Sequence, residues 1–218
     1  MKKRYLNKWL YLVPFFDYLI CLALISSLPD RIPTHFDINW VADGYGSKWT
    51  ILMFPTLLLG QLLLAEVLPK IDPLGKNYSR FDKTYKMVHI ILMILFIGIQ
   101  TICIMQSLEI NVVSFMPIYM GLLFVVLGNF FPKVKANYFL GIKTPWALND
   151  EENWNYTHRL GGRVWFVGGL FTMLLIFVPK EIQSKLMFIL VMAMALIPFV
   201  YSYLFFRKKK EVEKNVGN

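Results

Sequence analysis

The sequence predicts an all-α integral membrane protein with six transmembrane helices. Of the 218 residues, 56% are hydrophobic and only 17% are charged, and the mean hydropathy is +0.50. These values lie outside the range of soluble globular domains. The apolar residues also gather in long runs, and about 20 of them in one helix suffice to cross the hydrocarbon core of a bilayer. We therefore expect one integral membrane domain over residues 1–218.

Six stretches are long and apolar enough to span a membrane. They cover residues 9–28, 49–68, 87–108, 112–131, 164–178 and 186–206, and the fifth is short enough that we expect it to begin near Gly161. The chain should then form three helical hairpins, at 9–68, 87–131 and 164–206. The basic N-terminus resembles that of a signal peptide, but the apolar run after it is too long and lacks a cleavage site, which indicates an uncleaved signal anchor.

Positive charge predicts the orientation. Of the 23 lysines and arginines, only four fall in the first and fifth connections, on one side of the membrane: Arg31, Lys48, Lys180 and Lys185. All others fall in the N-terminus, the second and fourth connections and the C-terminal tail. Because basic loops stay in the cytoplasm, both termini are expected inside the cell. This asymmetry also explains the net charge of +9 without any binding of nucleic acid.

The first extracytoplasmic loop, residues 29–48, is expected to form a compact cap. Its prolines prevent a continued helix, and an Asp-Gly pair marks a turn. Its ring side chains suit contact with a peptide or a lipid, although the alternative is that they simply rest at the level of the lipid headgroups. The residues concerned are Pro29, Pro33, His35, Phe36, Trp40 and Tyr45.

The polar stretch over residues 128–169 is the main candidate for function. Pro132 should end the fourth span, and the residues before Pro145 should be a turn followed by an extended segment. Asn149 or Asp150 can cap a short amphipathic helix at the cytoplasmic surface, with glycines after its last turn. Gly161 and Gly168, like Gly162 and Gly169, are seven residues apart, so one helical face can approach a neighbour closely.

Catalytic and metal sites are not predicted. His158 has no nucleophile or paired base at a recognisable spacing, apart from the acids at 150–152. His35 and His158 fall on opposite sides of the membrane, and His89 lacks a partner one turn away, so no metal site or other cofactor is expected. Cys21 and Cys103 lie in apolar runs and form neither a disulfide framework nor a redox motif.

Asp17 lies near the middle of the first span. A charged carboxylate there costs about 2.5–3.5 kcal/mol, so an acid at this depth is a candidate proton relay. The alternative is a protonated side chain that is hydrogen-bonded to Gln61, Gln100 or Thr101. A proton relay at Asp17 would suit a small proton-coupled transporter.

Two stretches resemble a known family. The pattern GN-x7-NYF-x-GIKTPWAL, followed by Trp154 and Thr157-His158-Arg159, is similar to the signature of SdpI-type immunity proteins. The outer loop, with LP-x-x-IP-x-HF and DGYGSK, resembles the domain of unknown function that often precedes it. The signature positions are Gly128, Asn129, Asn137, Gly141, Lys143, Thr144, Pro145, Trp146, Leu148, Trp154 and His158, with Lys143 where arginine is usual and Ala147 where threonine is usual.

The resemblance implies a non-enzymatic, multi-pass protein of the bacterial plasma membrane. Such a protein protects its cell against a secreted peptide toxin. In the best-known case it also signals by holding a small DNA-binding repressor at the cytoplasmic face. The resemblance thus implies a lipid bilayer, a peptide toxin and a cytoplasmic repressor as partners, with no direct contact to nucleic acid. The alternatives are the transporter that uses Asp17 and a membrane-surface enzyme that uses His158.

Overall fold

The computed structural model describes residues 5–37, 41–110 and 112–216. Within these residues, six helices are long and apolar enough to cross a membrane, as predicted. Each includes one main α-helix, and short 3-10 turns extend several of them. The main helices are α1 (Leu12–Leu24), α2 (Met53–Ile71), α3 (Asp82–Ser107), α4 (Met116–Phe130), α6 (Glu151–Leu174) and α7 (Lys180–Val216), and a short α5 (Pro145–Leu148) precedes α6.

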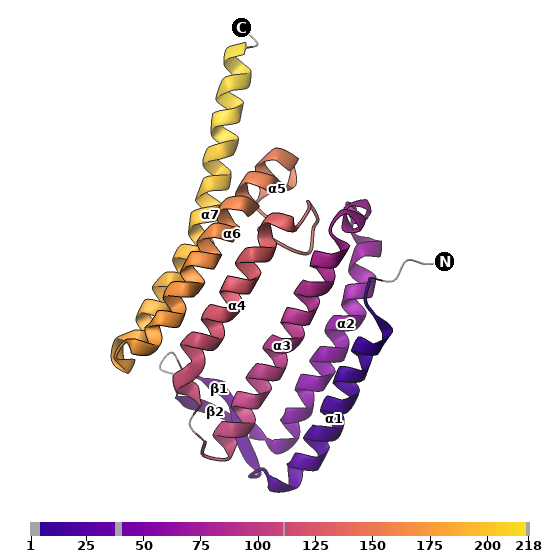
Figure 1. The fold of residues 1–218 in the computed structure, drawn as a ribbon, viewed down its shortest axis with the longest axis vertical. Helices are drawn as coiled ribbons and strands as arrows, with labels where there is room; N and C mark the ends of the chain where they lie inside the picture. Colours follow the sequence, from indigo (N-terminus) through magenta and orange to yellow (C-terminus); the bar gives the residue numbers. More distant parts are fainter. Residues whose placement is uncertain (1–4, 38–40, 111, 217–218) are drawn as a thin grey trace.

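The bundle has two distinct ends (Figure 1). The start of α1, the short helix α5 and the projecting end of α7 lie at one end, which we call the signature end. The connection from α1 to α2 lies at the opposite end, which we call the hairpin end. The six helices alternate in direction between the two ends, so the signature segment and the outer loop lie at opposite ends of the bundle.

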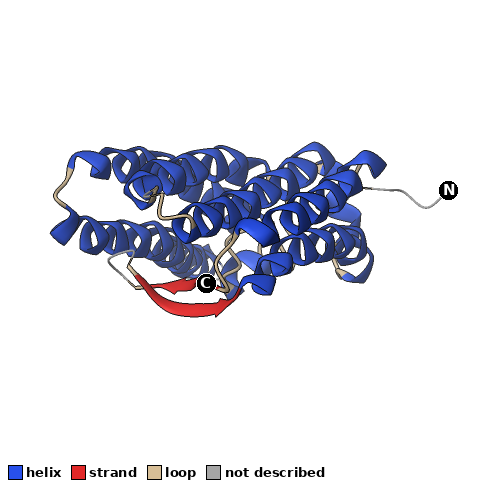
Figure 2. Cartoon of the chain, turned by 90° about the horizontal axis from the view of Figure 1, so that it is seen from below, coloured by secondary structure: helices blue, strands red, loops and turns tan. Residues whose placement is uncertain are grey.

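The loop at the hairpin end is a β-hairpin, an element that the all-α prediction did not include. Strands β1 (Arg31–Phe36) and β2 (Ala42–Ser47) are antiparallel, and they lie together at one side of the bundle (Figure 2). Ile32, which is 1% exposed, packs with residues of α1 and the start of α2. Gly44 allows the strands to meet, because a Cβ there would lie 2.8 Å from the Cβ of His35. Strands form here because the prolines exclude a helix and because buried backbone N–H and C=O groups must be hydrogen-bonded.

Helix α6 is continuous, which corrects the prediction of a separate short amphipathic helix before the fifth span. Asp150 caps it as predicted, since its side chain accepts a hydrogen bond from the N–H of Glu152. However, Gly161 and Gly162 lie inside the helix and do not end it. Both are buried against neighbouring elements, and in an apolar surrounding the backbone is best satisfied by an unbroken helix. Helix α7 also runs well past the predicted limits of 186–206.

The six helices pack as two groups, which we call the first lobe (α1–α3) and the second lobe (α4, α6 and α7). In the second lobe, α4 and α6 cross at glycines, and an ideal Cβ at Gly128 would lie 2.5 Å from the N of Phe166 and 2.7 Å from the O of Gly162. Between the two ends the lobes meet at Tyr119 of α4, whose hydroxyl donates to the carbonyl of Leu95 in α3 at 2.8 Å. At the signature end the loop before α5 joins them.

Candidate functional site at the signature end

The turn before α5 is organised by Asn137, which is fully buried. Its Oδ1 accepts hydrogen bonds from the N–H groups of Phe139 at 2.9 Å and Leu140 at 2.6 Å. Its Nδ2 donates to the carbonyl oxygens of Lys135 at 2.8 Å and Leu140 at 2.9 Å. One side chain therefore satisfies four backbone groups of a segment that forms neither helix nor strand, which is what a buried loop requires.

Asp72 connects this turn to the first lobe. Its Oδ2 accepts from the hydroxyl of Tyr78 at 2.7 Å and from the N–H of Tyr138 at 2.9 Å, and its Oδ1 accepts from the N–H of Leu74 at 2.7 Å. Burial and the neighbouring Asp72 raise the pKa of Tyr78, so its phenol remains a donor. Sequence analysis did not find Asp72 or Tyr78, because nothing near them distinguishes them from residues of an ordinary polar connection.

His158 has a structural position. Its ring stacks on Trp154, with centroids 4.1 Å apart, and Trp154 in turn donates from Nε1 to the carbonyl of Val134 at 2.9 Å. The N–H of Ile142 donates to His158 Nε2 at 3.0 Å. The proton of this neutral ring must then be on Nδ1, which lies 2.8 Å from the carbonyl of Trp154. With both nitrogens occupied and no exposed surface, His158 has no atom that can exchange a proton with a substrate, which argues against the enzyme alternative.

A second polar network joins α5, α6 and α7. Thr144 caps α5 by accepting from the N–H of Ala147 at 3.0 Å, and its hydroxyl lies 2.6 Å from that of Ser202 in α7. Ser202 donates to Asn153 Oδ1 at 2.8 Å, and Asn153 Nδ2 returns a hydrogen bond to the carbonyl of Ser202 at 2.9 Å. Thr157 also donates to Asn153 Oδ1 at 2.9 Å. All four side chains are at most 1% exposed, so the network fixes where α7 crosses α6.

Asn153 and Ser202 were missed by sequence analysis. Ser202 lies in an apolar run where a single hydroxyl gives little signal, and Asn153 follows two acids in the first turn of a helix. The spacing of Asn153 and Thr157 by one helical turn could have indicated a shared partner. That partner is 49 residues away from Asn153 in sequence, and only the fold brings it close.

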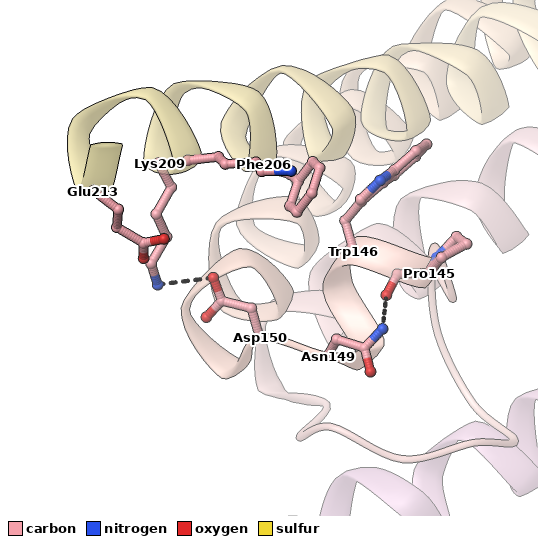
Figure 3. Close-up of a pocket in the computed structure, with 8 residues that line it drawn as sticks. Pro145, Trp146, Asn149, Asp150, Phe206, Lys209 and Glu213 are labelled. Carbon is pink, nitrogen blue, oxygen red and sulfur yellow. Dashed lines mark hydrogen bonds and ion pairs between the residues drawn. The ribbon is translucent and has the colours of Figure 1, made fainter. Parts of the chain in front are cut away.

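A cleft of about 690 Å³ opens between α5 and the projecting end of α7 (Figure 3). Trp146 and Phe206 form its aromatic wall, and the rings of Phe199 and Tyr203 also contact Trp146. The charged residues around the cleft include both signs. They are Asp150, Lys209, Lys210 and Glu213.

Lys209 holds the projecting part of α7 to the start of α6. Its Nζ lies 2.8 Å from Asp150 Oδ2 and 3.0 Å from Glu152 Oε2. Partial burial is the largest single influence on the pKa of Asp150 and raises it. The hydrogen bonds from Lys209 and from backbone N–H groups together outweigh it, and the pKa lies below its ordinary value. The Asp150 carboxylate is therefore charged at neutral pH, and its ion pair with Lys209 ties α7 to the start of α6.

The remaining signature residues differ in accessibility. Gly128 is buried at the crossing of α4 and α6, whereas Asn129 is exposed. Lys143 is also exposed, and its Nζ lies 3.4 Å from the carbonyl of Phe139. Pro145 lines the cleft, and Leu148 packs against the core of the bundle. The structure thus brings most signature positions together in one buried framework that presents Trp146 and Pro145 at a cleft.

The outer-loop residues lie far from this site, at the hairpin end. His35 Nδ1 lies 2.5 Å from Asp43 Oδ1, with the two side chains 72% and 49% exposed. Tyr45 is 50% exposed and Phe36 is partly buried. Pro33 is buried and Pro29 is exposed. Trp40 lies outside the described residues.

Asp17 is buried between α1 and α3. Of the three predicted neighbours, Gln100 is the partner, since its Nε2 lies 3.0 Å from Asp17 Oδ1. Gln61 instead bonds the carbonyl of His89, and Thr101 bonds its own helix. Asp17 Oδ2 and Gln100 Oε1 have no partner among the described residues. Because both are acceptors, one proton on the carboxyl would supply the donor that the pair lacks.

In the described parts of the chain, no three His, Cys, Asp or Glu side chains gather as a set that could hold a metal ion. Cys21 and Cys103 are both buried as free thiols. Cys21 lies against the Asp17–Gln100 pair, with Gln100 Nε2 2.9 Å from its sulfur.

Comparisons with known proteins find matches for both the signature segment and the outer loop. Residues 133–202 match the model of the SdpI/YfhL protein family, and residues 12–59 match a domain of unknown function, DUF1648. Over 196 residues the chain is 26% identical to the immunity protein SdpI of Bacillus subtilis (strain 168), which covers 87% of this chain and 93% of that protein. No solved structure matches the chain. The chain is a multi-pass cell membrane protein that is similar to the SdpI/YfhL family over residues 133–202.

Proposed function

We propose that this protein is a membrane immunity protein that protects its cell against a secreted peptide toxin. The observation that carries the proposal is the match over most of the chain to a relative named an immunity protein. The region matched by the family model contains the buried framework around Asn137, Thr144 and His158. We further propose that the hairpin end faces outward and the signature end faces the cytoplasm, as the distribution of basic residues predicts.

The β-hairpin is the proposed contact for the toxin. It lies at the outward end under this orientation, and His35 and Tyr45 present ring surface there. A two-stranded sheet also offers backbone groups at its edges, which can pair with an extended peptide. Both features suit a peptide ligand better than a small molecule.

Expression in a toxin-sensitive cell tests this proposal. The wild-type chain should confer resistance, and a variant with His35, Phe36, Trp40 and Tyr45 all changed to alanine should lose it. The measurement is survival against toxin concentration, with the amount of protein in the membrane fraction determined in parallel. A matched control changes Ser26 and Ser27, also exposed at this end but outside the hairpin, to alanine. If the aromatic variant inserts normally and still protects, the hairpin is not the recognition site.

We also propose that the cleft at the signature end receives a cytoplasmic repressor. In support, its aromatic wall and mixed charges suit a protein surface, and α7 projects beyond the bundle beside it. Such a contact would let toxin binding at one end alter a partner at the other end.

The second proposal has its own test. A repressor encoded beside this gene would be co-expressed with the chain, and its share in the membrane fraction would be measured with and without toxin. Phe206→Ala combined with Lys210→Glu should reduce membrane recruitment about 10-fold or more, because an aromatic anchor and a charge are removed from one cleft. Lys214→Glu, outside the cleft on the same helix, is the control. Undiminished recruitment by the double variant would exclude the cleft as the docking site.

A further inference from the structure

A groove runs along one side of the α6–α7 pair, apart from both proposed binding surfaces. Its volume is about 380 Å³, within the range of about 300–1,000 Å³ that is usual for ligand pockets. Helix α6 contributes Val167, Gly168 and Phe171, and helix α7 contributes Leu190, Met194 and Ile197. Gly168 lets the helices lie close at the floor, because a Cβ there would be 2.4 Å from the sulfur of Met194. The groove is apolar along its length.

The groove faces the surroundings of the bundle and not its core. Val167 is 49% exposed, Phe171 is 56% exposed and Ile197 is 46% exposed. In a six-helix membrane protein, the medium that meets such a surface at this depth is lipid. An acyl chain is therefore the apolar group that is available to fill the groove.

One charged residue, Arg163, stands at the end of this apolar groove. It lies 14 residues before Phe177, where this spanning helix ends, and therefore about 21 Å from the hairpin end at 1.5 Å per residue. In a core of about 30 Å, its Cα lies on the side of the signature end, from which a long side chain reaches the headgroups. Arg163 is exposed and has no hydrogen-bonding or ion-pair partner among the described residues.

A second arginine continues the same helical face. Arg159 lies one turn closer to the signature end, is also exposed, and has no ion-pair partner in the described part of the chain. The nearest acid on α6, Glu152, is engaged by Lys209. Two uncompensated guanidinium groups thus stand at headgroup depth above an apolar groove. Guanidinium groups bind phosphate through paired N–H donors, and unpaired positive charges close to lipid favour an anionic partner.

We propose that this groove binds an anionic phospholipid of the leaflet at the signature end. The phosphate lies against Arg163 and Arg159, and one acyl chain occupies the groove between α6 and α7. A bound lipid would neutralise the arginines and fill the space beside Gly168. The site would thereby stabilise the helix pair that carries the Thr144–Ser202–Asn153 network.

Native mass spectrometry of the full chain, purified in detergent, tests the proposal. The protein is titrated with phosphatidylglycerol and, separately, with phosphatidylcholine of the same acyl chains. We expect wild type to bind phosphatidylglycerol at least about 10-fold more tightly than phosphatidylcholine. Arg163→Gln should weaken phosphatidylglycerol binding about 10-fold, which is the usual loss for one charge-assisted pair of hydrogen bonds. Val167→Trp, which fills the groove, should weaken both lipids.

Two matched variants separate the groove from general effects. Lys214→Gln removes one charge from the exposed end of α7, and Leu63→Trp adds the same ring to α2, where Leu63 is 52% exposed. Both should bind lipid as wild type does, and thermal unfolding of every variant verifies its fold. Equal binding of the two lipids by wild type, or a loss in Lys214→Gln as large as in Arg163→Gln, would overturn the proposal.

Discussion

Gly141 shows how one backbone conformation holds the signature turn together. Its φ of +113° is rarely adopted by residues with a side chain. It also lies against the Nε2 edge of His158, so that the next N–H, from Ile142, reaches Nε2 of that ring. Sequence analysis placed Gly141 in a turn and His158 on a helix. It could not show that the two meet, because Ile142 and His158 are 16 residues apart and the start of α6 lies between them. No local sequence pattern predicts such a contact.

Gly141→Ala should destabilise the protein strongly. An ideal Cβ there would lie 2.4 Å from His158 Nε2, and the positive φ adds backbone strain of about 1–3 kcal/mol. We expect a loss on the order of 2–4 kcal/mol, measured as a lower Tm in detergent. Gly60→Ala is the matched control, since a Cβ at Gly60 meets nothing within 4 Å. That variant should be neutral or slightly stabilising, and equal Tm values for the two would contradict the role given to Gly141.

At the scale of the element, α6 uses adjacent glycines for different neighbours. Gly162 and Gly169 approach the backbone of α4, and Gly168 approaches Met194 of α7, while Gly161 faces Ile142 and Pro198. The seven-residue spacing predicted a close neighbour. The sequence could not show that two faces are used, because that depends on which helices flank α6 in space.

The two faces predict different costs for the same substitution. At Gly162 a Cβ would lie 2.7 Å from the backbone O of Gly128, which cannot rotate away. At Gly161 the nearest atom is Cδ1 of Ile142, the end of a flexible side chain. We therefore expect Gly162→Ala to cost about 1–3 kcal/mol and Gly161→Ala clearly less, since alanine also favours the helix by about 1 kcal/mol. Denaturant or thermal unfolding of both variants decides this, and the reverse order would contradict the described packing.

The β-hairpin is the element for which sequence analysis was least accurate. Two prolines and a turn signal correctly excluded a helix there. The pairing of β1 with β2 has irregular register between Pro33 and Phe36, and its buried anchor is Ile32, which lies between the two prolines in a segment with little alternation. Without that alternation, the sequence did not identify the strands.

At the scale of the whole molecule, orientation is the property on which the proposed partners depend. The structure places the hairpin and the signature turn at opposite ends, and the positive charges predict which end is inside. Cys21 and Cys103 are buried, so the wild-type chain supplies a low background for thiol labelling.

Cysteine labelling in intact cells tests this orientation. Tyr45→Cys should react with a membrane-impermeant maleimide in intact cells, because the hairpin end faces outward. Lys143→Cys should react only after permeabilisation. Both positions are exposed, so accessibility to solvent does not bias the comparison. Labelling of Lys143→Cys from outside would reverse the assignment of partners to the two ends.

The sequence by itself determined the six spans, the expected orientation and the resemblance to a family, because the length of apolar runs, the placement of charge and a long motif are all local properties. The tertiary structure alone decided that α6 is unbroken, that Asp72, Asn153 and Ser202 belong to the signature framework, and that Arg163 stands at the end of an exposed apolar groove. Each of these depends on residues distant in the chain. In an apolar medium, buried polar groups must form hydrogen bonds within the protein, and helices approach most closely at glycines. Which residues meet in these ways is therefore known only once the helices have packed.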